Sequence, residues 1–211
     1  MDGLFITLEG PDGSGKSTIA KLLGEYLKEE ELEYIETREP GGTDIGEDIR
    51  DIILDNKNTS MSHETEALLY AASRSQHVHE KIIPALDRGE IVLCDRFILS
   101  SLAYQGVGRG LGIEEVKAIN DFGTEGLYPD LILFFHIDPK ITLDRKLGSK
   151  NADRLENMGK DFHEKVYAGY MEVLEMYPEN IEIIDASRSV EEVLEQVLKL
   201  VKNKLEGRNL L

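Results

Sequence analysis

Residues 10–17 read GPDGSGKS, a complete phosphate-binding loop of the pattern G-x-x-x-x-G-K-[ST]. An apolar run over residues 4–8 precedes the loop, and a helical pattern over residues 19–28 follows it. In such a unit the glycines let the backbone wrap around phosphate oxygens, and the helix directs its positive end at them. Lys16 can reach the terminal phosphates, and Ser17 can ligate Mg²⁺. The stretch therefore predicts that a nucleoside triphosphate is bound by Gly10, Pro11, Asp12, Gly13, Ser14, Gly15, Lys16 and Ser17.

The composition limits what kind of protein this chain can be. Its 211 residues, 41% of them hydrophobic, suffice for one sizeable α/β domain, and we expect residues 1–211 to form it. The net charge of −17 argues against a nucleic-acid partner, and no apolar run is long enough to predict a membrane partner. The chain begins directly with the first expected strand, and its one cysteine, Cys94, has no internal disulfide partner. We therefore expect no signal peptide and a cytoplasmic location.

Apolar, strand-like runs alternate with helical patterns along the chain. The runs cover residues 4–8, 34–37, 91–94, 131–137 and 181–184. The helical patterns cover residues 19–28, 47–54, 63–86 with a break near Pro84, 100–105, 113–123, 139–146 and 161–176, followed by an apolar stripe from Val190 to Val201. This alternation predicts an α/β fold with a five-stranded parallel sheet flanked by helices. The polar stretch at roughly 146–160 predicts an exposed lid.

A second polar group follows the second and third expected strands. Residues 37–43 read TREPGGT, and the third strand ends in Asp95 and Arg96. Because ligands of doubly wound sheets bind beyond the carboxyl ends of the strands, Arg38 is expected to face a second phosphate. Asp95 is a candidate ligand of Mg²⁺, directly or through water, and Arg96 is a candidate phosphate clamp. The alternative is that Asp95 and Arg96 form an ordinary surface ion pair.

Two helical spacings bring further polar and aromatic side chains together. Tyr70 and Arg74 stand four residues apart, so they share a helix face. Ser101, Tyr104 and Gln105 follow an i, i+3, i+4 spacing and share another. An aromatic plane, a guanidinium group, a hydroxyl and an amide can together stack one heterocycle and bind its edge. The alternative for Tyr70, which lies in the apolar stretch LLYAA, is a place in the core.

Together these motifs resemble the thymidylate kinase family. The resemblance covers nearly the whole chain: the phosphate-binding loop, TREPGGT, LLYAASR at 68–74, DRFILSSLAYQG at 95–106, GLYPDL at 126–131 and DRLE at 153–156. It implies the fold of a P-loop nucleoside monophosphate kinase and transfer of the γ-phosphate of ATP to dTMP, giving dTDP and ADP for dTTP synthesis. It also implies Mg²⁺ arriving with ATP, and a homodimer.

The resemblance implies a set of residues that bind dTMP. Three arginines would hold its phosphate, an aromatic ring would stack on thymine, and a fourth arginine would bond a base carbonyl. A hydroxyl and an amide would read the edge of the base, and a tyrosine under the sugar would leave no space for a ribose 2′-hydroxyl. The three phosphate-binding arginines are Arg38, Arg50 and Arg96, and the stacking ring is Tyr70. The fourth arginine is Arg74, the hydroxyl and the amide belong to Ser101 and Gln105, and the tyrosine under the sugar is Tyr104.

The resemblance also implies which side chains assist the transfer. Lys16 and Arg96 would hold the phosphates, and Asp12 would face the sugar 3′-hydroxyl and the surroundings of the acceptor phosphate. The loop over residues 185–190 would border the adenine.

This chain differs from one subgroup of the family, which carries an arginine inside the phosphate-binding loop. Gly13 stands there, so the chain resembles the subgroup whose catalytic cations lie in the lid. Arg145 and Arg154 are the expected lid cations. Lys150 stands where an arginine is usual, and lysine lacks the bidentate phosphate contact of arginine. Tyr70 likewise replaces a usual phenylalanine.

Three other functions remain compatible with a phosphate-binding loop. The first is another P-loop kinase, acting on a different monophosphate or on a nucleoside. The second is a switch ATPase or GTPase, but the guanine-reading N-K-x-D is absent, since Asn56 and Lys57 precede Asn58 and Thr59. The third is a degenerate binding protein, against which the intact Lys16 argues.

Overall fold

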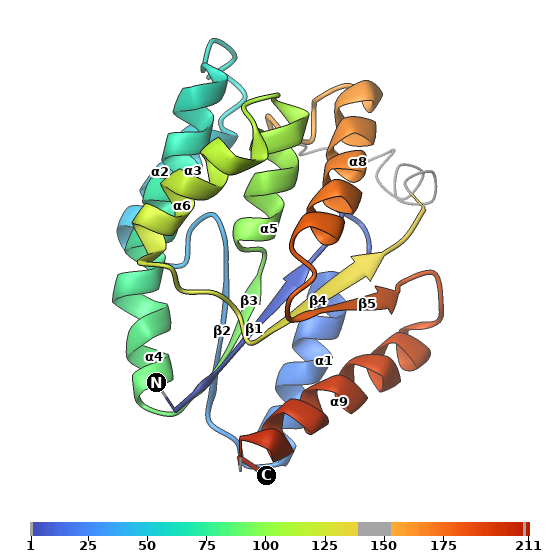
Figure 1. Ribbon diagram of the computed structural model, residues 1–211. Coiled ribbons are helices and arrows are strands. Elements are labelled where there is room, and N and C mark those ends of the chain that lie inside the picture. Colours follow the sequence, from blue (N-terminus) through green and yellow to red (C-terminus); the bar gives the residue numbers. More distant parts are fainter. Residues whose placement is uncertain (1, 139–152, 209) are drawn as a thin grey trace.

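The computed structural model describes residues 2–138, 153–208 and 210–211. At its centre five parallel strands form one sheet in the order β2-β3-β1-β4-β5 (Figure 1). The strands are β1 (Leu4–Glu9), β2 (Tyr34–Arg38), β3 (Ile91–Asp95), β4 (Leu131–His136) and β5 (Ile181–Asp185). The predicted α/β class and the five-stranded parallel sheet are confirmed.

The strand register brings the ends of three strands together. Asp95, at the end of β3, lies opposite Leu8 of β1 on one side and opposite Arg38 of β2 on the other. The strand order changes direction beside β1, because β3 pairs on one side of it and β4 on the other. Ligands of open parallel sheets bind at such a switch point. The fold therefore predicts a ligand site beyond the carboxyl ends of β1 and β3.

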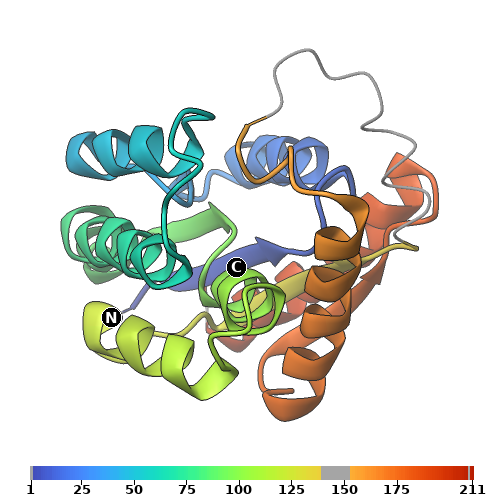
Figure 2. The same cartoon turned by 90° about the horizontal axis from the view of Figure 1, so that it is seen from above.

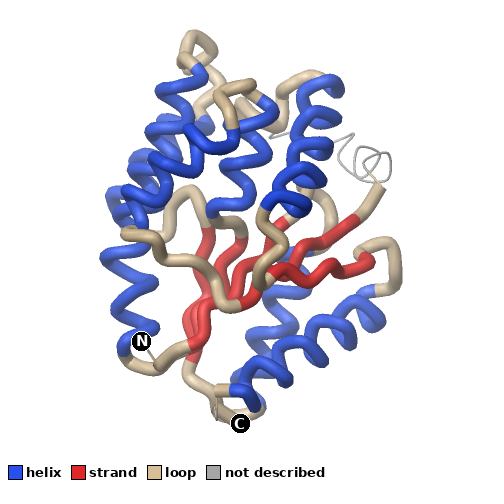
Figure 3. Tube along the Cα trace, viewed as in Figure 1, coloured by secondary structure: helices blue, strands red, loops and turns tan. Residues whose placement is uncertain are grey.

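Alternate side chains of each strand enter two separate apolar layers. Leu4, Ile6 and Leu8 of β1 pack with α1 (Lys16–Glu29) and α9 (Val190–Gly207). Phe5 points to the other face, where the helices from the middle of the chain pack. Figure 3 shows the helices on both sides of the strands. Burial on both faces explains why the three central strands, β1, β3 and β4, are apolar almost throughout, whereas the edge strands β2 and β5 are partly exposed and carry charged residues.

Side-chain caps fix where two of the middle helices begin. Thr43 accepts a hydrogen bond from the N–H of Gly46 (3.1 Å) at the start of α2 (Asp44–Leu54). Ser62 accepts one from Thr65 (3.1 Å) at the start of α3 (His63–His77). Such caps satisfy N–H groups that lack a partner within the helix. The remaining long helices are α6 (Ile113–Thr124) and α8 (Lys160–Met176).

Two helical stretches contain wide π-helical turns that the sequence did not predict. After α3 the chain passes through η1 (Val78–Ile82) into α4 (Ile83–Asp87), and α5 (Ile98–Ser101) continues into η2 (Leu102–Gly108). The chain stays helical through Pro84, where a break was expected. Pro84 lies in the first turn of α4, where the N–H that proline lacks is not needed.

The last helix and the segment before α8 differ in part from what the sequence predicts. The sequence predicts Val190 in the apolar stripe of the last helix, but Val190 is 45% exposed, and the buried stripe begins at Val193. The helix expected over residues 139–146 lies outside the described residues. The expected lid at roughly 146–160 is described only from residue 153, and α8 already begins at Lys160. Among the described helices, none has the length and apolar composition needed to cross a bilayer.

Candidate active site

The phosphate-binding loop joins β1 to α1. Gly10 has a φ of 130°, and a Cβ atom there would lie 2.7 Å from the carbonyl oxygen of Phe135. Only glycine fits this close approach. Gly15 adopts a left-handed φ of 92° directly before α1. α1 thus begins at Lys16, earlier than predicted, and its positive end faces the loop.

Lys16 is buried inside the loop. Its ammonium group donates hydrogen bonds to the carbonyl oxygens of Gly10 (3.0 Å) and Pro11 (2.9 Å). Burial, together with the nearby positive charge of Arg96, lowers the pKa of Lys16 to about 8. A phosphate at the loop would favour the charged form of this amine.

Ser17 and Asp95 lie close enough to share a metal ion. The Ser17 hydroxyl is 3.4 Å from Oδ2 of Asp95. Among the residues that the structure describes, Oδ1 of Asp95 is buried and has no hydrogen-bond partner. A hydroxyl and a carboxylate oxygen are ligands that suit Mg²⁺, which also keeps waters and substrate phosphates. The residues present therefore fit an Mg²⁺ ion that arrives with a nucleotide.

Arg96 contacts both the phosphate-binding loop and residues outside it. Its guanidinium group forms an ion pair with Asp12 and donates to the hydroxyls of Ser100 and Tyr170, both at 2.9 Å. The ion pair with Asp95, considered as an alternative, is therefore replaced by one with the loop residue Asp12. Tyr170 on α8 was not predicted as part of the site.

Glu9 positions Arg96 through two neighbouring residues. Arg96 has a left-handed φ of 71°, which is uncommon for a residue other than glycine. The buried carboxyl group of Glu9 accepts from the backbone N–H of Phe97 (2.7 Å) and from the hydroxyl of Ser100. Burial raises the pKa of Glu9. Glu9 therefore fixes both the backbone next to Arg96 and one partner of its side chain.

A cavity of about 220 Å³ lies beside the loop. Asp12 and Asp95 contribute to its wall, so the cavity adjoins the loop. Every residue expected to bind dTMP lines it, although they come from separate elements of the fold. These residues are Arg38, Arg50, Tyr70, Arg74, Arg96, Ser101, Tyr104 and Gln105.

Two arginines converge on one wall of this cavity. Arg38 and Arg50 each donate to the carbonyl oxygen of Pro40 at 2.8 Å, and Arg38 also pairs with Glu47 at 2.8 Å. Burial and the neighbouring charge of Arg38 lower the pKa of Arg50. Two like charges held close together favour an anion between them. This wall is suited to a phosphate group.

Arg74 is almost fully engaged by the protein. Its Nε donates to Glu39 (2.6 Å), one terminal nitrogen donates to Ser101 (3.0 Å) and Asn120, and the other donates to the Phe97 carbonyl (2.9 Å). A guanidinium group has five N–H donors. These bonds use four of them, so at most one further bond to a base carbonyl fits the observed arrangement. The expected contact of Arg74 with the base stays a prediction.

The two cavity tyrosines remain uncharged. Burial, reinforced by Glu66, raises the pKa of Tyr70, and burial with Asp12 nearby raises that of Tyr104. The Tyr104 hydroxyl lies 3.5 Å from Asp12, and the guanidinium carbon of Arg96 lies 5.5 Å from the centre of the Tyr104 ring. Their aromatic faces therefore offer neutral surfaces beside a cationic wall.

Glu66 organises a charged network that sequence reasoning missed. It is buried, and it accepts from Gln105 (3.0 Å), from Arg109 (2.9 Å) and from Arg154 (2.7 Å). Burial raises the pKa of Glu66, but the bonds from Arg109 and Gln105 outweigh this and lower it. A sequence signal was present, because Glu66 stands four residues before Tyr70 on the same helix face.

Of the two expected lid cations, Arg154 is among the described residues and Arg145 is not. Arg154 does not line the cavity; it pairs with Glu66, and its Nε donates to the carbonyl oxygen of Ile53 (2.8 Å). In this arrangement it fastens the segment before α8 to α2 and α3, and a contact with phosphate would require it to leave Glu66. Its catalytic role stays a prediction. Arg145 and Lys150 lie outside the described residues.

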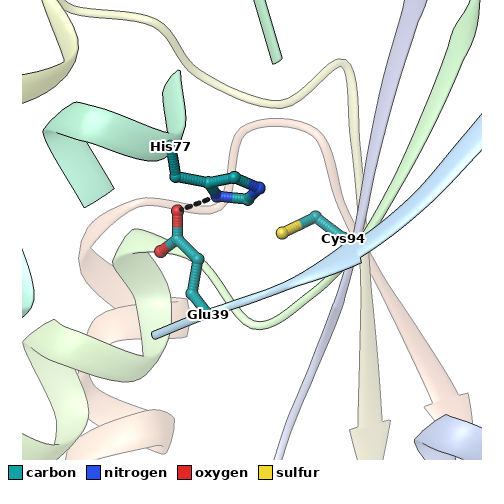
Figure 4. A group of neighbouring side chains, drawn as sticks. All are labelled: Glu39, His77 and Cys94. Carbon is teal, nitrogen blue, oxygen red and sulfur yellow. Dashed lines mark hydrogen bonds and ion pairs between the residues drawn. The ribbon is translucent and has the colours of Figure 1, made fainter. Parts of the chain in front are cut away.

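Glu39, His77 and Cys94 form a buried cluster next to the cavity (Figure 4). Nδ1 of His77 bonds Glu39 (2.9 Å), its Nε2 bonds the Thr37 hydroxyl (2.7 Å), and Glu39 also binds Arg74. The Cys94 thiol donates to the Arg96 carbonyl oxygen at 3.1 Å, and burial raises its pKa. The ligand atoms lie within 4.8 Å of one another. Glu39 and His77 already bind each other, Glu39 binds a guanidinium group and Cys94 binds a backbone carbonyl. These bonds favour a structural role over a metal site.

The phosphate-binding loop and an arginine-lined cavity thus adjoin at the carboxyl ends of β1 and β3, with Arg96 and Asp12 between them. Such an arrangement is that of a P-loop kinase, which places a triphosphate donor beside a phosphate acceptor and supplies mostly alignment and charge.

Comparisons with known proteins narrow this class. Residues 8–197 match the model of the family described as thymidylate kinase. A thymidylate kinase of Finegoldia magna is 58% identical over 201 residues, covering 95% of this chain and 98% of that protein. One of Clostridium novyi is 52% identical over 202 residues, covering 95% and 98%, and one of a Geobacillus species is 50% identical over 210 residues, covering 99% and 100%. This chain belongs to the thymidylate kinase family, and it is an enzyme.

Proposed function

We propose that this chain transfers the γ-phosphate of ATP to dTMP, producing dTDP and ADP for dTTP synthesis. The observation that carries this proposal is the first cavity. Its wall contains every residue expected to bind dTMP, and it adjoins the phosphate-binding loop. Family membership supports the same pair of substrates. We place the reaction in the cytoplasm, where ATP is available as the donor.

The arrangement supports a mechanism based on charge and alignment. Lys16 and the N–H groups at the start of α1 would hold the donor phosphates, while Arg38, Arg50 and Arg96 would hold the acceptor phosphate. Mg²⁺ bound by Ser17 and Asp95, directly or through water, would neutralise charge on the donor phosphates. The acceptor oxygen attacks directly, so no protein nucleophile takes part.

The experiment that tests this function is an assay of ADP formation with Mg²⁺ and a panel of acceptors. With dTMP, dUMP, CMP and AMP compared at equal concentration, dTMP is expected to give the highest kcat/KM. Stimulation by another monophosphate alone would indicate a different P-loop kinase. Hydrolysis that no acceptor stimulates would argue for a switch ATPase instead.

Replacing Tyr104 with alanine should weaken discrimination against the sugar 2′-hydroxyl. Tyr104 lines the cavity and is 9% exposed, so its ring occupies space that alanine would leave open. The preference for dTMP over its ribose counterpart should narrow by about 1–3 kcal/mol, the usual worth of a small steric difference. The ratio of the two kcat/KM values measures this. Tyr104→Phe, which keeps the ring, should retain the preference; an unchanged ratio in Tyr104→Ala would remove the ring from the sugar pocket.

We further propose that two chains associate through the outer face of α2, α3 and α6. These helices lie side by side in Figure 2, with α3 in the middle. Each carries a large apolar residue in solvent: Ile45 is 53% exposed, Leu68 is 56% exposed and Phe122 is 90% exposed. Exposed apolar residues gathered on one face are typical of an interaction surface.

Replacing Phe122 with glutamate is therefore expected to separate the dimer into monomers. A charge buried in an apolar interface loses its hydration without gaining a partner. Sedimentation equilibrium of the wild type and the variant measures the change. Ile183→Glu on the edge strand β5, where Ile183 is 61% exposed, is the matched control and should leave the association unchanged. Equal masses for the wild type and Phe122→Glu would contradict the proposed interface.

A further inference from the structure

A second cavity, of about 300 Å³, lies on the α5–α8 face of the sheet. It extends between β1, β4 and the segments that follow α6 and α8, and no residue of its wall lines the first cavity. The side walls are aliphatic, formed mainly by Ile98, Leu102, Ile132 and Ile181. Its size and apolar walls are those of a small-molecule site, and the catalytic scheme above makes no use of it.

The floor of this cavity carries a polar group without a partner. Thr7 and Glu9 lie on the same face of β1 as Phe5, because side chains alternate along a strand. Thr7 is fully buried, and among the described residues its hydroxyl has no hydrogen-bond partner. A buried hydroxyl without a partner costs free energy, so a ligand with a hydrogen-bonding group would be favoured at this depth.

The mouth of the cavity offers aromatic surface beside a lysine that is already paired. The ammonium group of Lys117 lies 5.2 Å from the centre of the Tyr128 ring and 5.8 Å from that of Tyr177. That ammonium group already pairs with Asp121 at 2.6 Å. The Tyr177 hydroxyl donates to Glu114 at 2.5 Å. Glu179 also lines the cavity but is exposed to solvent, so an ion pair with it would contribute little to binding. A flat neutral ring can instead pack between the aromatic side chains.

We propose that this cavity is a second binding site, for an uncharged planar aromatic molecule that carries one hydrogen-bond donor. The ring packs between the aliphatic walls, and the donor is accepted by the Thr7 hydroxyl at the floor.

The floor of the cavity also adjoins the group that holds Arg96. Glu9 and Phe97 both line this second cavity, and the bond between them fixes the backbone beside Arg96. A ring against Glu9 and Phe97 would press on these contacts, so binding here weakens binding of dTMP. This coupling, unlike the binding site itself, rests on the function proposed above.

Binding is tested by titrating the full-length chain with indole, followed by ¹H–¹⁵N spectra. Indole is expected to bind with a Kd of roughly 0.1–1 mM, the range for a ligand of its size, and to shift signals near Thr7 and Phe97. Benzofuran has the same shape without the donor and should bind several-fold more weakly. An absence of shifts, or shifts confined to the first cavity, would mean that the second cavity holds only water and would overturn the proposal.

Two variants localise the site. Thr7→Val keeps the shape and should lower the affinity for indole to that for benzofuran. Ile181→Trp fills the cavity from its partly buried rim and should abolish binding of both. Undiminished binding by a folded Ile181→Trp chain would overturn the assignment. If that variant fails to fold, Thr7→Val decides: an unchanged preference for indole would remove the hydroxyl from the site.

The coupling is tested by calorimetry of dTMP binding without ATP. Saturating indole should weaken dTMP affinity about five-fold in the wild type and have no effect in Ile181→Trp. If dTMP binds equally with and without indole, the coupling is refuted while the site stands. If dTMP does not bind at all, the proposed function fails, and the indole titration still decides the site.

Discussion

Replacing Lys16 with alanine is expected to lower kcat at least ~100-fold, the scale of losing one preorganised charge at a developing negative centre. The ammonium group of Lys16 is held inside the phosphate-binding loop by carbonyl oxygens, in a place that no other described cation occupies. Steady-state assays with saturating ATP and dTMP measure the loss. Lys21→Ala, further along α1 with a side chain 78% exposed, is the matched control and should keep near-normal turnover. Near-normal turnover by Lys16→Ala would contradict the role of this lysine.

The same substitution is expected to leave the fold intact. The pKa of Lys16 falls from 10.5 to about 8 on folding, so the unfolded chain binds more protons between these values, and the free energy of unfolding rises with pH across that window. Below about pH 8 the folded protein bears the full cost of burying the charged amine. Lys16→Ala removes that cost, so its thermal midpoint at neutral pH should equal or exceed that of the wild type. A loss of activity with retained stability separates catalysis from folding.

Replacing Glu39 with alanine should have the largest effect on stability. Glu39 binds the guanidinium group of Arg74 and the ring of His77, and the side chains of all three are at most 2% exposed. Alanine would leave a buried guanidinium group without its counter-charge, a change that costs about 3–5 kcal/mol. Urea-unfolding curves measure the difference in the free energy of unfolding. Because Arg74 lines the first cavity, steady-state assays should also give a raised KM for dTMP.

The controls for Glu39 separate burial from charge. Glu39→Gln keeps the shape and part of the hydrogen bonding, so it should cost less than alanine. Glu47→Ala removes the partner of Arg38, where the two side chains are 46% and 43% exposed, and should cost no more than about 1 kcal/mol. Equal losses in the free energy of unfolding for Glu39→Ala and Glu47→Ala would contradict the expectation. They would show that burial of the ion pair between Glu39 and Arg74 does not determine its contribution to stability.

The sequence predicted those parts of the protein that depend on short, contiguous patterns. The phosphate-binding loop, the alternation of apolar runs with helical patterns and the arginine in TREPGGT each lie within a few residues. The strand order then brought Arg38 next to Asp95, as expected from the rule for ligands of parallel sheets. The remaining cavity residues were predicted from the resemblance to a family, and spacing alone did not assign their roles.

The supporting residues were missed because their partners are distant in sequence. Tyr170 meets Ser100 across 70 positions, and Glu9 meets Phe97 across 88. The spacing of Ser101, Tyr104 and Gln105 predicted one α-helical face, but the chain widens into η2 after Ser101. Tertiary packing decides such turns, and periodicity does not report it.

The single thiol of this chain has a practical consequence. Cys94 is the one cysteine among the 211 residues; it is fully buried, and burial raises its pKa. Only thiolate reacts readily with a disulfide dye, so the folded protein should stay unlabelled while opened molecules react. The rate of dye release therefore reports how often the core opens, without denaturant. A cysteine introduced at Phe122 would meanwhile be labelled alone, which gives a fluorescent reporter of chain association against a silent background.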